Sequence, residues 1–204
     1  AMASVTHTNL EVIYGRETWR DRPVLVVEYL GGGTLRNRLA RGCVPLAETV
    51  ALGTALADAL EALHGHGLLH RDIKPGNIGF SATGTPKLLD FGVAKLFSPE
   101  LEAAAAQAST GSSTDQTTGP TDVPQELTAS LIGTPPYMAP EAIRRELPRP
   151  SFDLWALAVV LFEALAGINP FHGASVPETL SRIQSVTPPD LRAYLRGSPE
   201  TVAA

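Results

Sequence analysis

The sequence has only one cysteine, Cys43, among 204 residues, so no internal disulfide can form. A disulfide-stabilised scaffold is thereby excluded, and a reducing, cytoplasmic compartment is the expectation. Positive charge is also scarce, because 16 Lys and Arg stand against 21 Asp and Glu, a formal net charge of -5. Nucleic-acid-binding proteins usually carry a basic stripe, and the sequence shows none, so we expect no nucleic-acid partner.

Long apolar runs are missing as well. The longest, residues 154–167, is interrupted by Glu163 and is too short to cross a bilayer, so no membrane span is expected. No signal peptide opens the chain, and residues 1–3 are interpreted as a cloning remnant. Hydrophobic residues nevertheless make up 44% of the chain, which is enough to bury a core and argues against disorder.

The first part of the chain predicts a β-hairpin followed by helices. Residues 10–19 and 24–29 are rich in β-branched and aromatic residues, with a turn at 20–23. Gly31 to Gly33 break the second strand, and Thr34 can cap a short helix that ends at Leu39. A long helix is predicted over 45–64, with Pro45 in its first turn and an apolar face made by Leu52, Leu56, Ala59, Leu60 and Leu63.

The second part predicts a short hairpin, a low-complexity segment and more helices. The hairpin pairs 77–80 with 87–89, and the low-complexity segment covers 98–126. Ser151 is predicted to cap a strongly apolar, buried helix that ends at Ala166. Ser175 to Glu178 form a capping box for another helix, and Ser198 gives a further cap signal.

Three short motifs carry the chemistry. His70-Arg71-Asp72 is followed by Asn77, then by Asp90-Phe91-Gly92, and later by Ala139-Pro140-Glu141. Each triplet alone is weak evidence, but their joint order and spacing make coincidence negligible. On these residues the chain resembles the eukaryotic-type (Hanks-type) Ser/Thr protein kinases. The resemblance implies an α+β, mainly α-helical fold, namely a kinase large lobe with a short β-hairpin from the small lobe.

The resemblance implies a role for each residue of the catalytic loop. Asp72 would be the base that accepts the proton of the substrate hydroxyl, and Lys74 would reach the γ-phosphate. Asn77 and Asp90 would hold Mg²⁺ against the phosphates of ATP. Thr134 would hydrogen-bond the catalytic loop and shape the groove for a protein substrate. ATP and Mg²⁺ are therefore the expected cofactors.

The hinge and the activation loop also have counterparts in the family. Val27 would be the gatekeeper, while the Glu28 carbonyl and the Leu30 amide would bond adenine. Gly79 stands where the family usually places an apolar side chain under adenine, which weakens the predicted floor of the nucleotide pocket.

Four further residues are implied to regulate the enzyme. Arg71 and Lys95 would form a cationic pocket for a phosphorylated activation loop, with Thr128 as the first choice of phosphosite and Ser130 as the second. The alternative for both hydroxyls is an ordinary solvated loop residue. The Ser/Thr-rich insert is interpreted as a plain disordered loop in preference to a regulatory array.

The sequence departs from the family pattern at both ends. It contains no Gly-rich phosphate loop, no strand lysine and no partner glutamate for that lysine, and the buried arginine expected to pair with Glu141 would lie beyond 204. The resemblance therefore divides the chain into the last small-lobe strands and hinge (4–30) and a large lobe (31–204) that is incomplete at its C-terminus. We expect a fragment truncated at both ends.

Three functional hypotheses remain open. The first is a fragment of a Ser/Thr protein kinase that is inactive alone. The second is a non-catalytic kinase-like binding module, and the third is half of a split kinase. Expected partners are a protein substrate, a small lobe or partner chain, and a second copy bound through the hairpin edge. A metal site made by His64, His66 and His70 is the less favoured interpretation of those residues.

Overall fold

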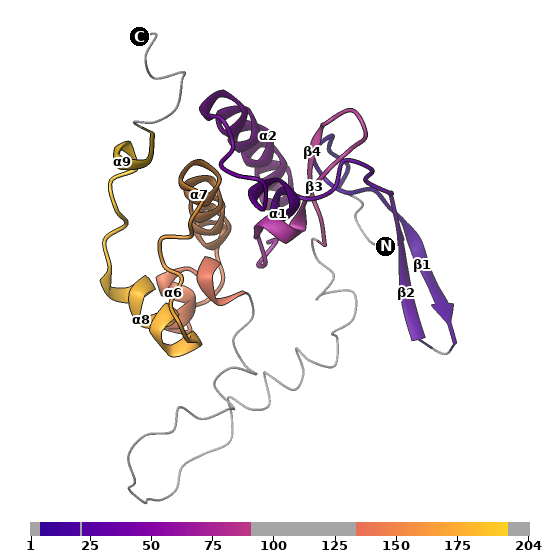
Figure 1. The fold of residues 1–204 in the computed structure, drawn as a ribbon. Coiled ribbons are helices and arrows are strands. Elements are labelled where there is room, and N and C mark those ends of the chain that lie inside the picture. The colour runs from indigo at the N-terminus through magenta and orange to yellow at the C-terminus, as the bar shows by residue number, and fades with distance from the viewer. Residues whose placement is uncertain (1–4, 21, 91–133, 196–204) are drawn as a thin grey trace, which may run out of the picture.

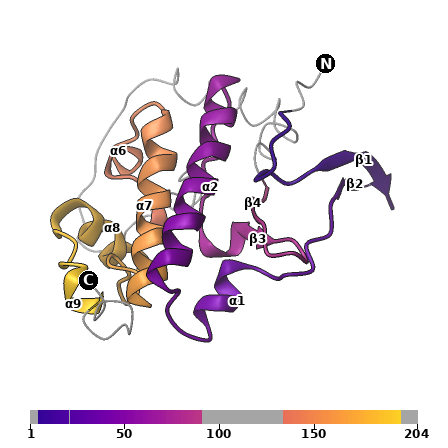
Figure 2. The same ribbon diagram turned by 90° about the horizontal axis from the view of Figure 1, so that it is seen from above.

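The computed structural model describes residues 5–20, 22–90 and 134–195. Its helices lie beside one another in a compact body, from which one β-hairpin projects (Figures 1 and 2). The strands are β1 (Ile13–Trp19), β2 (Arg22–Val27), β3 (Ile78–Phe80) and β4 (Pro86–Leu88). The α-helices are α1 (Leu35–Leu39), α2 (Leu46–Gly65), α6 (Pro140–Ile143), α7 (Pro150–Ala166), α8 (Val176–Ser185) and α9 (Arg192–Leu195). Two 3₁₀ helices, η1 (Pro75–Asn77) and η2 (Pro135–Tyr137), complete the described elements.

The projecting hairpin is the antiparallel pair β1–β2. Its register runs from Ile13 opposite Val27 to Trp19 opposite Arg22, so the turn is shorter than the predicted residues 20–23. Arg22 and Pro23 belong to β2 because they pair with Trp19 and Thr18 at the turn end of the hairpin. Residues 10–12 do not belong to β1, contrary to the prediction, because Leu10 instead forms a parallel bridge with Leu88 in the core.

The core lies mainly between α2 and α7. All five residues of the predicted apolar face of α2 are buried, which confirms that pattern: Leu52, Leu56, Ala59, Leu60 and Leu63. From α7, Ala156, Leu157 and Val160 join the same cluster. The other side of α7 buries Val159 against Phe171 and Ile183, so the helix packs on two sides, although Leu154 is exposed.

Two predicted helix starts were wrong by one or two residues. α2 begins at Leu46 with Pro45 as its N-cap, and α7 begins at Pro150 with Arg149 as its N-cap. Ser151 therefore lies inside the first turn and is not the cap, because Pro150 can open the helix without losing a hydrogen bond. The Ser175 cap is confirmed, since its hydroxyl accepts from the Glu178 amide, but the capping box is incomplete because Glu178 Oε2 accepts from the amide of Ala174. Ser198 lies outside the described residues.

The short β3–β4 hairpin places the catalytic-loop residues. Residues 66–74 connect α2 to η1 and β3, and the antiparallel register of β3–β4 sets Gly79 opposite Lys87. The amide of Leu89 donates to the carbonyl of Asn77 at 2.9 Å, so the residues before and after this hairpin lie side by side. None of the helices described is both long and apolar enough to cross a membrane.

Candidate active site

A single buried carboxylate holds the start of the catalytic loop. Asp153, in the first turn of α7, is 1% exposed. Its Oδ2 accepts from the amide of His70 at 2.9 Å, and its Oδ1 accepts from the amide of Arg71 at 2.8 Å. The Nε2 of His64 lies 2.9 Å from the same Oδ2. The loop that carries Asp72 is therefore fixed to α7 through its backbone.

Strained backbone stands on both sides of the site. Arg71, directly before Asp72, has φ 69°, and Asp90 has φ 59°. Residues with a β-carbon adopt this left-handed region at a cost, and such strain persists where surrounding contacts enforce it. The hydrogen bonds that the amides of residues 70 and 71 donate to Asp153 hold Arg71 in this conformation.

The carboxylate of Asp72 is surrounded by the other predicted catalytic residues. Thr134 Oγ1 donates to Asp72 Oδ1 at 2.8 Å, and Asn77 Nδ2 donates to Asp72 Oδ2 at 3.0 Å. Lys74 Nζ contacts Asp72 Oδ2 and donates to Thr134 Oγ1 at 3.1 Å. Residues separated by up to 62 positions thus meet at one carboxylate, whose side chain is still 34% exposed. An anchored and partly exposed carboxylate is suited to accept a proton from an approaching hydroxyl.

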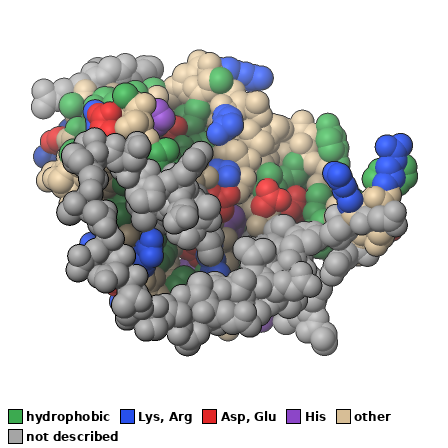
Figure 3. Space-filling view, turned by 90° about the horizontal axis from the view of Figure 1, so that it is seen from below, with side chains coloured by type: hydrophobic (Ala, Val, Ile, Leu, Met, Phe, Trp, Pro, Cys, Tyr) green, Lys and Arg blue, Asp and Glu red, His purple; other side chains and the backbone are tan. Residues whose placement is uncertain are grey.

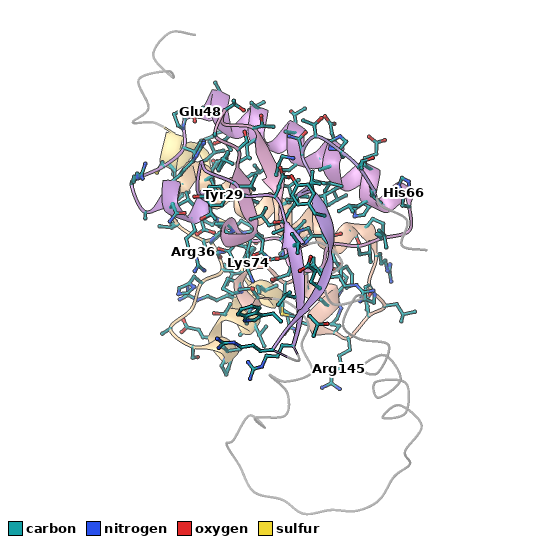
Figure 4. The ribbon with its side chains drawn as sticks, turned by 90° about the vertical axis from the view of Figure 1, so that its right-hand side faces the viewer. Tyr29, Arg36, Glu48, His66, Lys74 and Arg145 are labelled. Atoms are coloured by element: carbon teal, nitrogen blue, oxygen red, sulfur yellow. The ribbon has the colours of Figure 1, made fainter. Side chains whose placement is uncertain are left out.

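Lys74 lies in the same region of the molecule as Arg36 of α1 (Figure 4). From α1, the guanidinium group of Arg36 approaches Gly76 of η1, with its Nε 3.9 Å from where a β-carbon of Gly76 would stand. Two cations therefore lie beside the loop that carries Asp72. Such a setting suits a reaction in which negative charge develops on a phosphoryl group.

Asn77 and Asp90 could hold a magnesium ion. The Nδ2 of Asn77 is bound to Asp72, which leaves its amide oxygen for other contacts. Asp90 is exposed, and its carboxylate forms no ion pair with any described residue. One carboxylate and one amide oxygen match the few protein ligands that Mg²⁺ takes when phosphates supply others. The residues present therefore fit the ion.

The residues predicted to bind adenine lie at the end of β2 and in the following segment. Val27 is 38% exposed. Within the described part of the chain, neither the Glu28 carbonyl nor the Leu30 amide has a backbone partner, so both can bond a ligand. Gly79 lies beneath: a β-carbon there would come within 2.5 Å of Leu30 Cδ1 and 3.1 Å of Leu89 Cδ1. Leu30 and Leu89 thus fill the space that an apolar residue 79 would take.

The three histidines have separate structural roles. His70 is buried, its Nδ1 accepts from the Asp72 amide at 3.3 Å, and burial lowers its pKa. His64 contacts Asp153, whereas His66 Nδ1 lies 2.8 Å from the carbonyl of Ala62 on the surface. Among the described residues, no group of three His, Cys, Asp or Glu side chains could hold a metal ion.

A cavity of about 520 Å³ adjoins Asp72 on the side of η2, α6 and α7. Arg71 lines it together with Arg145 and Arg149, and its walls are mostly apolar, for example Met138 and Phe152. On the face seen in Figure 3, acidic and basic side chains lie close together among apolar side chains and backbone. Of the predicted regulatory residues only Arg71 can be placed, since Lys95, Thr128 and Ser130 lie outside the described residues.

Glu141 does not have the buried setting predicted for it. Its side chain is 39% exposed and lies 3.6 Å from Arg144 Nη2, one turn away on the surface. An exposed carboxylate needs no buried arginine as a partner, so the pairing predicted for Glu141 is not required by this geometry. The nearby Tyr137 hydroxyl donates to Glu163 Oε2 at 2.7 Å, and burial together with that carboxylate raises its pKa far above the ordinary value.

Sequence reasoning missed Asp153, although a signal for it exists. It is the only acidic residue in the first turn of a helix whose following residues are almost all apolar. A carboxylate in that setting must find several donors or lie in water. The partners, which are backbone amides more than 80 positions away, leave no trace in the sequence.

Comparisons with known proteins agree with this geometry. The family model described as protein kinase domain matches residues 1–188. The chain is 35% identical over 187 residues to Serine/threonine-protein kinase PknK of Mycobacterium tuberculosis, covering 90% of this chain and 14% of that protein. It is 35% identical to PknB of Mycolicibacterium smegmatis, covering 87% of this chain and 25% of that protein. For PknL of Mycobacterium tuberculosis the identity is 32%, covering 98% and 44%. The chain therefore spans less than half the length of each of these relatives.

Proposed function

This chain belongs to the protein kinase domain family, and we propose that it transfers the γ-phosphoryl group of ATP to a Ser or Thr hydroxyl of a protein substrate. One observation carries the proposal. The Asp72 carboxylate is anchored by Thr134 and Asn77, with Lys74 alongside. Positioning and charge stabilisation supply most of the catalysis of phosphoryl transfer, and both are present here.

The residues divide the work as follows. Asp72 accepts the proton of the substrate hydroxyl while the hydroxyl oxygen forms a bond to the γ-phosphorus of ATP. The bond between that phosphorus and the β-γ bridging oxygen breaks, and ADP leaves. Lys74 offers a cation beside the transferred group, and Thr134 keeps both side chains in place. Asn77 and Asp90 would hold Mg²⁺, which neutralises phosphate charge when bound. The Glu28 carbonyl and the Leu30 amide orient adenine.

Replacement of the base tests this function. Asp72→Asn keeps the size of the side chain and its ability to accept hydrogen bonds, but it is no longer a useful base. In the full-length protein, we expect phosphoryl transfer from Mg·ATP to a generic Ser/Thr substrate, measured by intact mass, to fall by about 10²- to 10⁴-fold. Asp58→Asn, at an exposed position of α2, is the matched control and should retain full activity. Equal activity of Asp72→Asn and the parent protein would refute the assignment.

We further propose that these 204 residues are inactive by themselves, because they contain no Gly-rich phosphate loop and no strand lysine. The nucleotide then lacks part of its cradle. The test is to compare transfer by the 204 residues with transfer by the full-length protein. Activity of the short form would contradict inactivity. Specific binding without Asp72-dependent transfer in the full-length protein would instead favour a kinase-like binding module.

The β1–β2 hairpin is the proposed attachment point for the remaining strands, supplied by a small lobe, a partner chain or a second copy. Two strands make up its sheet in the described residues, and Tyr14 and Trp19 are 69% and 63% exposed. Paired strands with open edges and exposed aromatic residues favour strand addition. Light scattering of the 204 residues should show a dimer that a Tyr14→Lys variant loses. A parent chain that stays monomeric would exclude self-association.

A further inference from the structure

One buried ion pair connects β4 to the nucleotide-binding segment. Lys87 Nζ lies 2.7 Å from Glu28 Oε1, and the two side chains are only 12% and 17% exposed. The same Nζ donates to the carbonyl of Leu10 at 3.1 Å. Lys87 thus joins three segments that are distant in sequence: β4, the residues before β1 and those after β2.

Glu28 is held through its backbone amide and through one of its two carboxylate oxygens. Its amide donates to the Val12 carbonyl at 2.9 Å, and its Oε1 accepts from the Val12 amide at 2.7 Å as well as from Lys87. Its own carbonyl has no backbone partner within residues 5–20, 22–90 and 134–195. Among the described residues, the carbonyl assigned to adenine therefore has no backbone partner, whereas the amide and Oε1 of the same residue are held.

The strand that carries Lys87 also places the metal-binding residues. Lys87 pairs with Gly79, two residues after Asn77, and it precedes Asp90 by three residues. The segment after Val27 therefore has a direct polar link to the strand that leads to Asp90. An adenine ring and a phosphate-bound ion would be held by two parts of the same connected unit.

Stability alone is a weak reason to bury this pair. Well-packed apolar residues of similar volume usually stabilise a fold as well as a buried ion pair or better, whereas an ion pair fixes a particular geometry. Lys87 and Glu28 meet at the point where backbone position decides ligand contact. The pair is therefore placed where geometry matters more than burial.

We infer that Lys87 is a positioning residue for the nucleotide, which acts by holding Glu28 so that its carbonyl faces adenine. The inference rests on the proposed function, because it assigns the role to ATP binding at that site. Lys87 itself touches neither the reacting atoms nor the substrate hydroxyl in this assignment. Loss of Lys87 should weaken binding of ATP while leaving the chemical step nearly intact.

A double-mutant cycle in the full-length protein tests the inference. Lys87→Met and Glu28→Gln should each raise KM for ATP by about tenfold, with kcat changed by less than about twofold. Because both act through one contact, the double variant should be no worse than either single variant. It also removes both charges and so avoids an unpaired buried ion if a single variant fails to fold. Lys87→Arg should restore most of the affinity.

The matched control removes a comparable cation elsewhere. Arg182 on α8 lies 2.7 Å from Glu178 Oε1, and Arg182→Met should leave KM for ATP unchanged. A normal KM in folded Lys87→Met, or additive effects in the double variant, would overturn the inference. Absence of any Asp72-dependent transfer by the parent protein would instead refute the proposed function, so the two failures are distinguishable.

Discussion

His64 and Asp153 stand 89 positions apart in the sequence and meet with Nε2 of the imidazole 2.9 Å from Oδ2 of the carboxylate. His64 belongs to the last turn of α2 and Asp153 to the first turn of α7, so the contact joins the two longest helices of the described residues. Asp153 also accepts from the amides of His70 and Arg71. The packing of two helices thereby sets the position of the catalytic loop.

Substitution of Asp153 should therefore affect stability and activity together. Asp153→Asn can accept at only one atom and leaves some of its three donors without a partner, which should cost about 3 kcal/mol. Chemical denaturation gives the free energy of unfolding, and the transfer assay gives activity. We expect the free energy of unfolding and the activity both to fall. A variant as stable as the parent would show that the contacts of Asp153 with the loop are dispensable. Exposed Asp190→Asn is the control.

The stability of the protein should fall as the pH drops below neutrality. Burial lowers the pKa of His70 from its ordinary value of 6.5, against the opposing pull of Asp153 and Asp72. Between pH 6.5 and the lowered folded value, the unfolded chain binds a proton that the folded chain does not, so the free energy of unfolding falls as the pH falls. Denaturation between pH 7.5 and 5.0 measures this slope. His70→Phe should flatten it, and an unchanged slope would contradict the assignment.

Gly32 should tolerate no side chain, whereas its neighbour Gly31 should. A β-carbon at Gly32 would lie 2.5 Å from the carbonyl oxygen of Ser81 and 2.8 Å from Phe80, while at Gly31 the nearest atom is 3.7 Å away. Gly32→Ala should lower the free energy of unfolding by about 2 kcal/mol, because backbone atoms must move. Gly31→Ala is the matched control and should change it little. Thermal unfolding of the pair decides the point.

Phosphorylation at Thr128 is the remaining prediction from the sequence, and it concerns a residue outside the described ranges. A phosphate there would form charge-assisted hydrogen bonds with Arg71 and Lys95. Thr128→Ala in the full-length protein should lower activity by at least about tenfold, equivalent to the loss of one such bond. Ser130→Ala should have a smaller effect. Unchanged activity of Thr128→Ala would exclude this phosphosite.

The sequence predicted most of the elements, because these depend on local patterns, whereas the members of the candidate site followed from the family resemblance and their roles stay predictions. The apolar spacing in α2 and the cap at Ser175 are signals within a few residues, and both are confirmed. The bounds of β1 were wrong because Leu10 pairs with Leu88, a partner that no local pattern indicates. Likewise, the glycine at position 79 predicted a weaker apolar surface under adenine, whereas Leu30 and Leu89 occupy the space that a side chain there would take.

The attachment of the catalytic loop to α7 through its backbone has a consequence for inhibitor chemistry. Asp153 accepts hydrogen bonds from the backbone amides of residues 70 and 71. Any substitution at these positions except proline keeps those amides. A compound that filled the adjoining cavity of about 520 Å³ would touch Asp72 and Asp153 without lining up against Val27, Glu28 or Leu30, which do not line that cavity. Resistance through substitution of Asp153 would carry a loss of stability, because the same carboxylate anchors the loop to α7.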